Sequence, residues 1–118
     1  MAQHIDLGKQ GEQLAEDYLR QHNYTILHRN WRYSRYEIDI IALKNEVLHF
    51  VEVKLRSSKN YGLPEEHVSK KKFKFLTQAA DEFLFLHPEY KHIQFDILAI
   101  ATLPNTETEF FFIEDVFL

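Results

Sequence analysis

Hydrophobic residues along the chain follow two different spacings, and these predict where helices and strands lie. Two segments carry apolar side chains at the period of a helical stripe. We expect the first helix over Gly8–His22, with its end at Asn23. The second is expected to run from about Glu65 or Val68 to Leu86.

Other segments are rich in Ile, Val, Leu and Phe and are short enough for strands. The predicted strands are Tyr24–Tyr33, Glu37–Leu43, Val47–Leu55, His92–Thr102 and Phe110–Ile113. The second and third are apolar on both faces near their middles, which is typical of central strands covered by helices on both sides. The order of elements therefore predicts an α/β fold, a mixed sheet flanked by helices, formed by residues 1–118 as a single domain.

The hairpin between Glu37 and Lys54 carries charged residues inside these apolar runs. With a two-residue turn at Asn45-Glu46, Asp39 would lie opposite Glu52, and Glu37 opposite Lys54. All four would share one sheet face, because strand side chains alternate with period two. Such residues are seldom buried unless paired or coordinating, so the hairpin is the predicted functional site. The alternative is a pair of strand ends whose charges reach solvent.

Two carboxylates on one face of adjacent strands supply the hard oxygen ligands that Mg²⁺ and Mn²⁺ prefer. Lys54 lies two residues beyond Glu52, about 7 Å further along the same face. From there it would contact a phosphate or position an attacking water. The pattern predicts metal-assisted hydrolysis of a phosphodiester bond.

The composition narrows the classes of protein. The chain has no cysteine, which excludes disulfides and thiolate zinc sites, and its histidines form no HExxH pair. No basic segment followed by an apolar one begins the chain, and no segment has 18 uncharged apolar residues, so we expect a cytoplasmic protein without membrane contact.

Charge is unevenly distributed. The net charge is −4, but residues 54–80 hold seven Lys/Arg against two Glu, or +5, and residues 81–118 hold one Lys against eight Asp/Glu, or −7. This asymmetry is compatible with a basic face that meets a polyanion, and equally with an ordinary solvated helix face. The candidate phosphate contacts are Arg29, Arg32, Arg35, Arg56, Lys70, Lys71, Lys72 and Lys74.

Several segments together resemble the bacterial UPF0102 family, also called YraN-like. The matching segments are Gly8-x-x-Gly11-Glu12-x-x-Ala15-x-x-Tyr18-Leu19, Ile26-Leu27-x-Arg29-Asn30-x-Arg32, Glu37-Ile38-Asp39-Ile40-Ile41-Ala42, Phe50-Val51-Glu52-Val53-Lys54-x-Arg56 and Phe95-Asp96-Ile97-Leu98-Ala99-Ile100. Asp39 followed by Glu52-Val53-Lys54 also matches the signature of the PD-(D/E)xK nuclease superfamily. The resemblance implies a restriction-endonuclease-like αβββαβ core, similar to Holliday junction resolvases.

The resemblance also implies roles for individual residues. Asp39 and Glu52 would be metal ligands, with the carbonyl of Val53 as a third. Lys54 would be the catalytic lysine, and Glu12 the glutamate that resolvase-like members bring toward the metal. DNA would be the substrate, and a homodimer would allow symmetric cutting of two strands.

Two further positions are expected to support the site, and one departs from the family. Glu37 shares the face of the two carboxylates, and Gln78 lies on the helix after the motif strand, where many superfamily nucleases place a polar residue. Tyr36 stands where the family commonly has Gly, so the turn at Arg35-Tyr36 is expected to differ in shape.

Three functions remain open on the sequence. The leading one is a Mg²⁺-dependent nuclease acting on DNA, including branched or structured DNA. The others are a non-catalytic nucleic-acid-binding module for repair or recombination and a protein-interaction domain with a vestigial site.

Overall fold

The computed structural model describes residues 3–56, 70–102 and 108–116, which form two helices and five strands. In chain order the elements are α1 (Gln3–Gln21), β1 (Thr25–Tyr33), β2 (Tyr36–Lys44), β3 (Val47–Arg56), α2 (Lys70–Leu86), β4 (His92–Ala101) and β5 (Glu109–Ile113). The predicted α/β class and αβββαβ core are confirmed, and the predicted last strand is present as β5.

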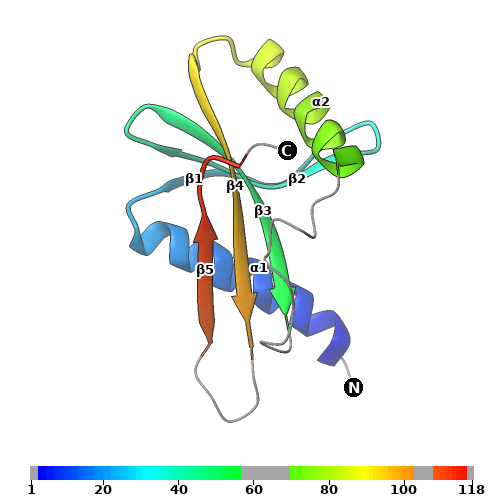
Figure 1. Cartoon of the computed structure of the whole chain (residues 1–118), viewed down its shortest axis with the longest axis vertical. Coiled ribbons are helices and arrows are strands. Elements are labelled where there is room, and N and C mark those ends of the chain that lie inside the picture. The colour runs from blue at the N-terminus through cyan, green and yellow to red at the C-terminus, as the bar shows by residue number, and fades with distance from the viewer. Residues whose placement is uncertain (1–2, 57–69, 103–107, 117–118) are drawn as a thin grey trace.

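The five strands form one mixed sheet in the order β1-β2-β3-β4-β5. Neighbours are antiparallel except β3 and β4, which run parallel because the chain crosses over between them through α2. In Figure 1, α1 lies across the lower half of the sheet and α2 beside its upper half.

Each helix covers its own part of the core. The core on the α2 side contains Ile38, Ile41, Leu48, Phe50, Leu76, Ala79, Ala80, Phe83, Ile97 and Val116. The core on the α1 side contains Ala15, Leu19, Tyr24, Ile40, Ala42, Val51, Leu98 and Ile100. Helix α1 approaches β3 closely at Gly11, where an added Cβ would lie 2.5 Å from the side chain of Leu55. Neither described helix is long and apolar enough to cross a bilayer.

The central hairpin has the register predicted from its turn. Asn45 and Glu46 have φ values of 52° and 66°, as a two-residue type I′ turn requires. Leu43 consequently pairs with Leu48, and the ladder continues to Ile40 opposite Val51. This continuation brings Asp39 and Glu52 to the same level of the hairpin.

Element ends differ slightly from the predictions. Helix α1 begins at Gln3, five residues before the expected start, since no proline interrupts that segment. Its predicted end is confirmed, because Asn23 has a φ of 70° and the Tyr24 N–H donates to the Leu19 carbonyl at 2.9 Å. The proposed start of the second helix, at Glu65 or Val68, lies outside the described residues.

The turn between β1 and β2 does not require a glycine at position 36. The left-handed residue is Ser34, with a φ of 56°, whereas Tyr36 begins β2 without a positive φ. Its ring packs 5.2 Å from that of Phe75 on α2. Tyr36 thus adds an aromatic side chain to the α2 side of the sheet.

Candidate functional site

The β2–β3 ladder ends where the two carboxylates meet. Its last pair joins Ile40 to Val51, and beyond it the Val53 N–H donates to Oδ2 of Asp39 at 2.8 Å. A side-chain carboxylate therefore accepts the hydrogen bond that a main-chain carbonyl would accept in a continuing ladder. This arrangement fixes Asp39 at the point where the hairpin strands stop pairing.

Asp39 also lies between the two faces of the sheet. Ile38 packs into the core on the α2 side, and Ile40 packs into the core on the α1 side. Hollows of about 170 and 190 Å³ occur on the α2 and α1 sides, and Asp39 lines both. The α2-side hollow is formed by Arg35, Tyr36, Glu37, Asp39, Glu52, Lys72, Phe75 and Leu76. The α1-side hollow is formed by Glu12, Arg29, Asp39, Ile40, Val53 and Leu55.

The two carboxylates interact in a poorly hydrated place. Burial, then the negative charge of Glu52, raises the pKa of Asp39 from 3.8 to about 7, against the opposing effect of the Val53 N–H. Glu52 is itself only 5% exposed. Asp39 and Glu52 therefore lie close together, as expected. Ionising both carboxylates in this buried place costs free energy unless a cation neutralises them.

Two lysines approach the same oxygen of Glu52. Nζ of Lys72 lies 2.8 Å from Oε1, and Nζ of Lys54 lies 3.6 Å from it. Burial opposes the charged form of Lys72, but the hydrogen bond to Glu52 and the nearby acidic charges outweigh it and raise the pKa of Lys72. The structure thus places Lys54 beside Glu52, as expected, and adds Lys72 as the closer cation.

Glu12 lies on the α1 side of Asp39, and the two residues line one hollow. Its carboxylate accepts hydrogen bonds from Arg29 at 3.0 Å and from Asn30 at 3.2 Å. Arg29 also contacts Glu16 at 3.1 Å. These bonds keep Glu12 near the carboxylate pair but direct its oxygens toward β1.

The two residues expected to support the site are placed differently. Glu37 lines the α2-side hollow, although its carboxylate is occupied by Nε of Arg32 at 2.6 Å. Gln78 lines neither hollow, and its Oε1 is buried without a hydrogen-bond partner among the described residues. Of these two, only Glu37 borders the carboxylate pair.

Several of the expected phosphate contacts already hold acidic partners. Arg29 forms an ion pair with Glu12 of α1, Arg32 with Glu37, and Lys72 with Glu52. Nζ of Lys71 lies 5.9 Å from the centre of the Phe75 ring. The side chains of Arg56 and Lys70 lie outside the described part of the chain. Three of the described basic side chains are therefore engaged by acidic residues of the protein itself.

Sequence reasoning did not foresee that Lys72 would bind Glu52. The signal was present in the sequence, since lysines crowd the first turns of α2, where the helix dipole favours acids. A contact between residues twenty positions apart depends on how α2 crosses the sheet, which periodicity alone does not determine.

Asp96 has a structural role, because it accepts hydrogen bonds from His49, Gln94 and the Asp115 N–H.

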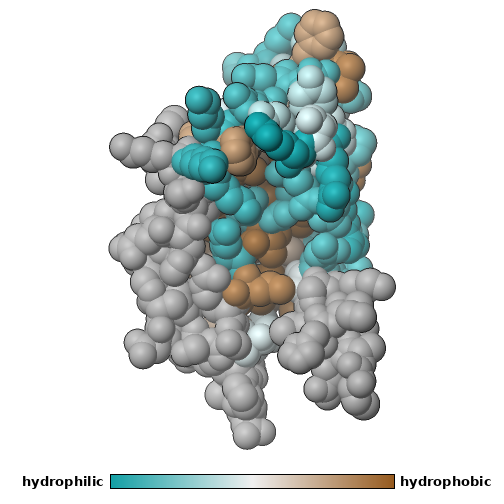
Figure 2. Space-filling model, turned by 90° about the vertical axis from the view of Figure 1, so that its right-hand side faces the viewer, coloured by the Kyte–Doolittle hydropathy of each residue, from teal (hydrophilic) through white to brown (hydrophobic). Residues whose placement is uncertain are grey.

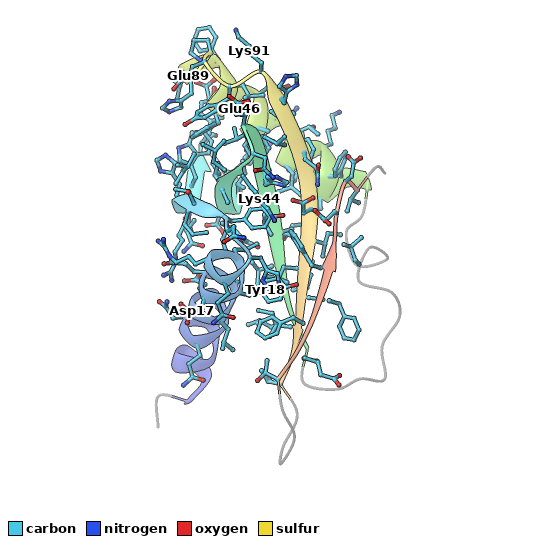
Figure 3. All side chains as sticks on the ribbon, turned by 90° about the vertical axis from the view of Figure 1, so that its left-hand side faces the viewer. Asp17, Tyr18, Lys44, Glu46, Glu89 and Lys91 are labelled. Atoms are coloured by element: carbon cyan, nitrogen blue, oxygen red, sulfur yellow. The ribbon has the colours of Figure 1, made fainter. Side chains whose placement is uncertain are left out.

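A hollow larger than the α2-side and α1-side hollows lies elsewhere. It measures about 390 Å³ and is formed by Leu43, Glu46, Glu89, Tyr90, Lys91 and His92. Figure 3 shows Glu46, Glu89 and Lys91 gathered at the end of the molecule that carries the hairpin turn. None of the carboxylate pair or its lysines lines it, so we place the candidate site by its buried charge and not by volume.

Comparison with known proteins identifies the family. The model of the uncharacterised protein family UPF0102 matches residues 11–100. The chain is a member of the UPF0102 family.

Individual UPF0102 proteins match most of the chain. A UPF0102 protein of Bacteroides fragilis is 44% identical over 100 residues, which cover 85% of this chain and 83% of its own length. One of Chlorobium phaeobacteroides is 48% identical over 104 residues, covering 87% and 82%. One of Parabacteroides distasonis is 41% identical over 119 residues, covering 99% and 96%.

The UPF0102 match includes the residues that form the site, from Glu12 to Lys72. Within residues 3–56, 70–102 and 108–116, no three His, Cys, Asp or Glu side chains gather as a ready-made metal cage. Two adjacent carboxylates nevertheless fit Mg²⁺, which is usually held by one or two carboxylates together with waters and substrate phosphates. The raised pKa of Asp39 reflects the crowding of negative charge that a divalent cation would relieve.

Proposed function

We propose that this UPF0102 chain is a Mg²⁺-dependent nuclease that hydrolyses phosphodiester bonds of DNA, including branched or structured DNA. The observation that carries the proposal is the buried contact between Asp39 and Glu52, with two lysine ammonium groups on Glu52. A fold has little structural reason to bury two adjacent carboxylates, because their desolvation and repulsion both lower stability.

The residues suit phosphodiester chemistry. Asp39, Glu52 and the carbonyl of Val53 would hold the metal, which when bound supplies a more acidic water and positive charge against the phosphate. Lys54 is held near Glu52 by their 3.6 Å contact and would orient a water or a phosphate oxygen. Glu12 would act from the α1 side through the hollow that it shares with Asp39.

DNA would approach from the α2 side. Arg35 is an exposed residue that lines that hollow, with its guanidinium 5.8 Å from the Tyr36 ring centre and 6.0 Å from that of Phe75. Lys71 lies over the same Phe75 ring. Figure 2 shows the side of the molecule that bears α2, where hydrophilic side chains cover the upper part and hydrophobic atoms are seen between them. Exposed cations around aromatic faces are suited to phosphates and unpaired bases.

The decisive experiment is a cleavage assay with labelled duplex, single-stranded and four-way DNA, with and without Mg²⁺ or Mn²⁺. We expect metal-dependent cutting that Asp39→Asn and Lys54→Ala abolish. Asp81→Asn, a change of the same kind at an exposed position of α2, should leave cutting intact. Cutting that persists in EDTA, or in both site variants, would refute the assignment.

A second candidate is a non-catalytic nucleic-acid-binding module that assists repair or recombination. The ion pair between Lys72 and Glu52 favours it, since this pair neutralises the site without a metal. Salt-sensitive DNA binding without cutting would select this candidate. Loss of all DNA binding would reject both. For the nuclease, a homodimer would supply two sites for two strands, which sedimentation with four-way DNA would test.

A further inference from the structure

Lys72 and Lys54 contact the same carboxylate oxygen of Glu52, but at different distances and with different exposure to solvent. Both ammonium groups contact Oε1 of Glu52, but Lys72 is closer, at 2.8 Å against 3.6 Å. Lys72 also comes from a separate element, α2, and its side chain is 47% exposed, whereas that of Lys54 is 16% exposed. Of the two lysines seen to contact Glu52, the closer one is therefore also the more exposed to solvent.

We propose that Lys72 takes the place of the divalent cation in the metal-free protein and must leave Glu52 for the metal to bind. This inference rests on the proposed function, because it concerns the same metal site. It assigns to Lys72 a regulatory role that the superfamily signature, Asp39 with Glu52-Val53-Lys54, does not include.

The electrostatics require such a cation. The α2-side hollow is lined by three acidic residues, Glu37, Asp39 and Glu52, together with Lys72. A buried carboxylate without a partner is strongly destabilising, so Glu52 needs positive charge whether or not metal is present. A metal and an ammonium group cannot both lie at hydrogen-bonding distance from the same oxygen without repelling each other.

Of the two lysines on Glu52, Lys72 is the one placed to move away from it. Its four-carbon stem is flexible, its side chain is about half exposed, and its ammonium group gains hydration when it moves outward. Lys54 has no such path, because it lies on β3 in the interior of the sheet and is mostly covered. Lys72 is thus the lysine that moves.

The released Lys72 is then able to contact a phosphate. It lies near the beginning of α2, beside Lys71, and on the side of the sheet where Arg35 borders the hollow. A phosphate that attracts Lys72 makes Glu52 available, and a metal on Glu52 makes Lys72 available. Metal and nucleic acid should therefore bind with positive coupling, and the coupling must be reciprocal.

The first test measures Mn²⁺ binding by titration calorimetry, without DNA, for the wild type, Lys72→Met and Lys72→Gln. Lys74→Met, which removes an exposed lysine of the same helix, controls for the general loss of one positive charge. We expect both Lys72 variants to bind Mn²⁺ about tenfold more tightly than the Lys74 variant, since a charge-assisted contact no longer competes. Gln retains a hydrogen-bond donor for Glu52, so this variant keeps the test valid if the Met variant does not fold.

The outcomes separate the inference from the function. Equal Mn²⁺ affinity in the Lys72 and Lys74 variants would overturn the inference and leave the nuclease proposal standing. Weaker binding in the Lys72 variants would also overturn it, and would mean that Lys72 positions Glu52 for the metal. If no protein binds Mn²⁺, both the inference and the metal-dependent function fail.

The second test measures coupling directly. Binding of a fluorescent single-stranded oligonucleotide with phosphorothioate linkages is compared in EDTA and in Mn²⁺. We expect Mn²⁺ to tighten oligonucleotide binding several-fold in the wild type and not in the Lys72 variants. Lys74 is itself a candidate phosphate contact, so its variant is expected to start from a weaker affinity but to keep the same Mn²⁺ effect. An equal Mn²⁺ effect in all four proteins would show that Lys72 does not couple the two sites.

Discussion

Replacing Asp39 by Asn should stabilise the metal-free protein at neutral and alkaline pH, although it removes a candidate ligand. The pKa of Asp39 is about 7 in the folded protein, mainly because the carboxyl group is buried and then because Glu52 is near, against an ordinary value of 3.8. The folded state therefore binds this proton more tightly than the unfolded state does. Asn keeps an oxygen that can accept the 2.8 Å hydrogen bond from the Val53 N–H.

The pH dependence follows from this difference. Below pH 3.8 both states are protonated at Asp39, and the side chain carries no penalty. As pH rises from 3.8 to 7, the unfolded state ionises first and the free energy of unfolding decreases. Above pH 7 both states are ionised and the penalty is constant. A difference of about 3 pH units corresponds to at most about 4 kcal/mol, so Asp39→Asn should exceed the wild type by up to that amount at pH 8.

Urea unfolding in EDTA would measure the effect, with the fluorescence of Trp31 as the signal. Trp31 is the single tryptophan of the chain, and its ring lies 5.3 Å from that of Phe83 in the core. The advantage of Asp39→Asn should grow from pH 5 to pH 8, whereas Asp81→Asn, at an exposed position, should show little change across this range. The reasoning would be refuted if Asp39→Asn were less stable than the wild type at pH 8. It would also be refuted if the gain in unfolding free energy were the same at pH 5 and pH 8.

Three other substitutions test the surrounding structure. Glu46→Gly should raise the free energy of unfolding by about 1 kcal/mol in urea, because Glu46 has a φ of 66° in the hairpin turn. Asp96→Ala should lower it by about 3 kcal/mol, since it leaves His49 and the Asp115 N–H without their acceptor; a loss below 1 kcal/mol would mean that water replaces the carboxylate. Arg29→Gln should reduce DNA affinity less than Lys71→Gln in a binding titration, because Arg29 is held by Glu12 and Glu16; the opposite order would show that Arg29 leaves α1 to bind DNA.

The sequence was sufficient for the parts of the fold that depend on local pattern. Turn length and period-two alternation determine the hairpin register, so the pairing of Leu43 with Leu48 and the approach of Asp39 to Glu52 could be predicted. The interruption of the ladder at Asp39 could not be, since alternation assumes an unbroken strand. Asn30, with a φ of 53° in β1, is another local change that apolar periodicity does not reveal.

Basic residues show the limit of sequence reasoning more clearly. Arg29, Arg32 and Lys72 all qualified as phosphate contacts by charge alone, yet each has an acidic partner within 3.0 Å. Whether an arginine or lysine is available depends on contacts between separate elements, such as those of α1 with β1 and of α2 with β3. The positions of cations could be predicted, but their partners required the tertiary structure.

The choice between a nuclease and a binding module reduces to one exchange at Glu52. Its oxygen Oε1 contacts the ammonium group of Lys72, and the proposed catalysis would require a divalent cation to take that place. If the exchange is unfavourable, the same residues would suit the second candidate function, a domain that binds DNA without cutting it. The geometry favours exchange, because Lys72 is half-exposed and recovers hydration on leaving, whereas the buried pair of Asp39 and Glu52 gains the larger charge that it lacks. Under the two proposals above, displacement of one lysine, and not the presence of the motif alone, would separate the nuclease from the binding module.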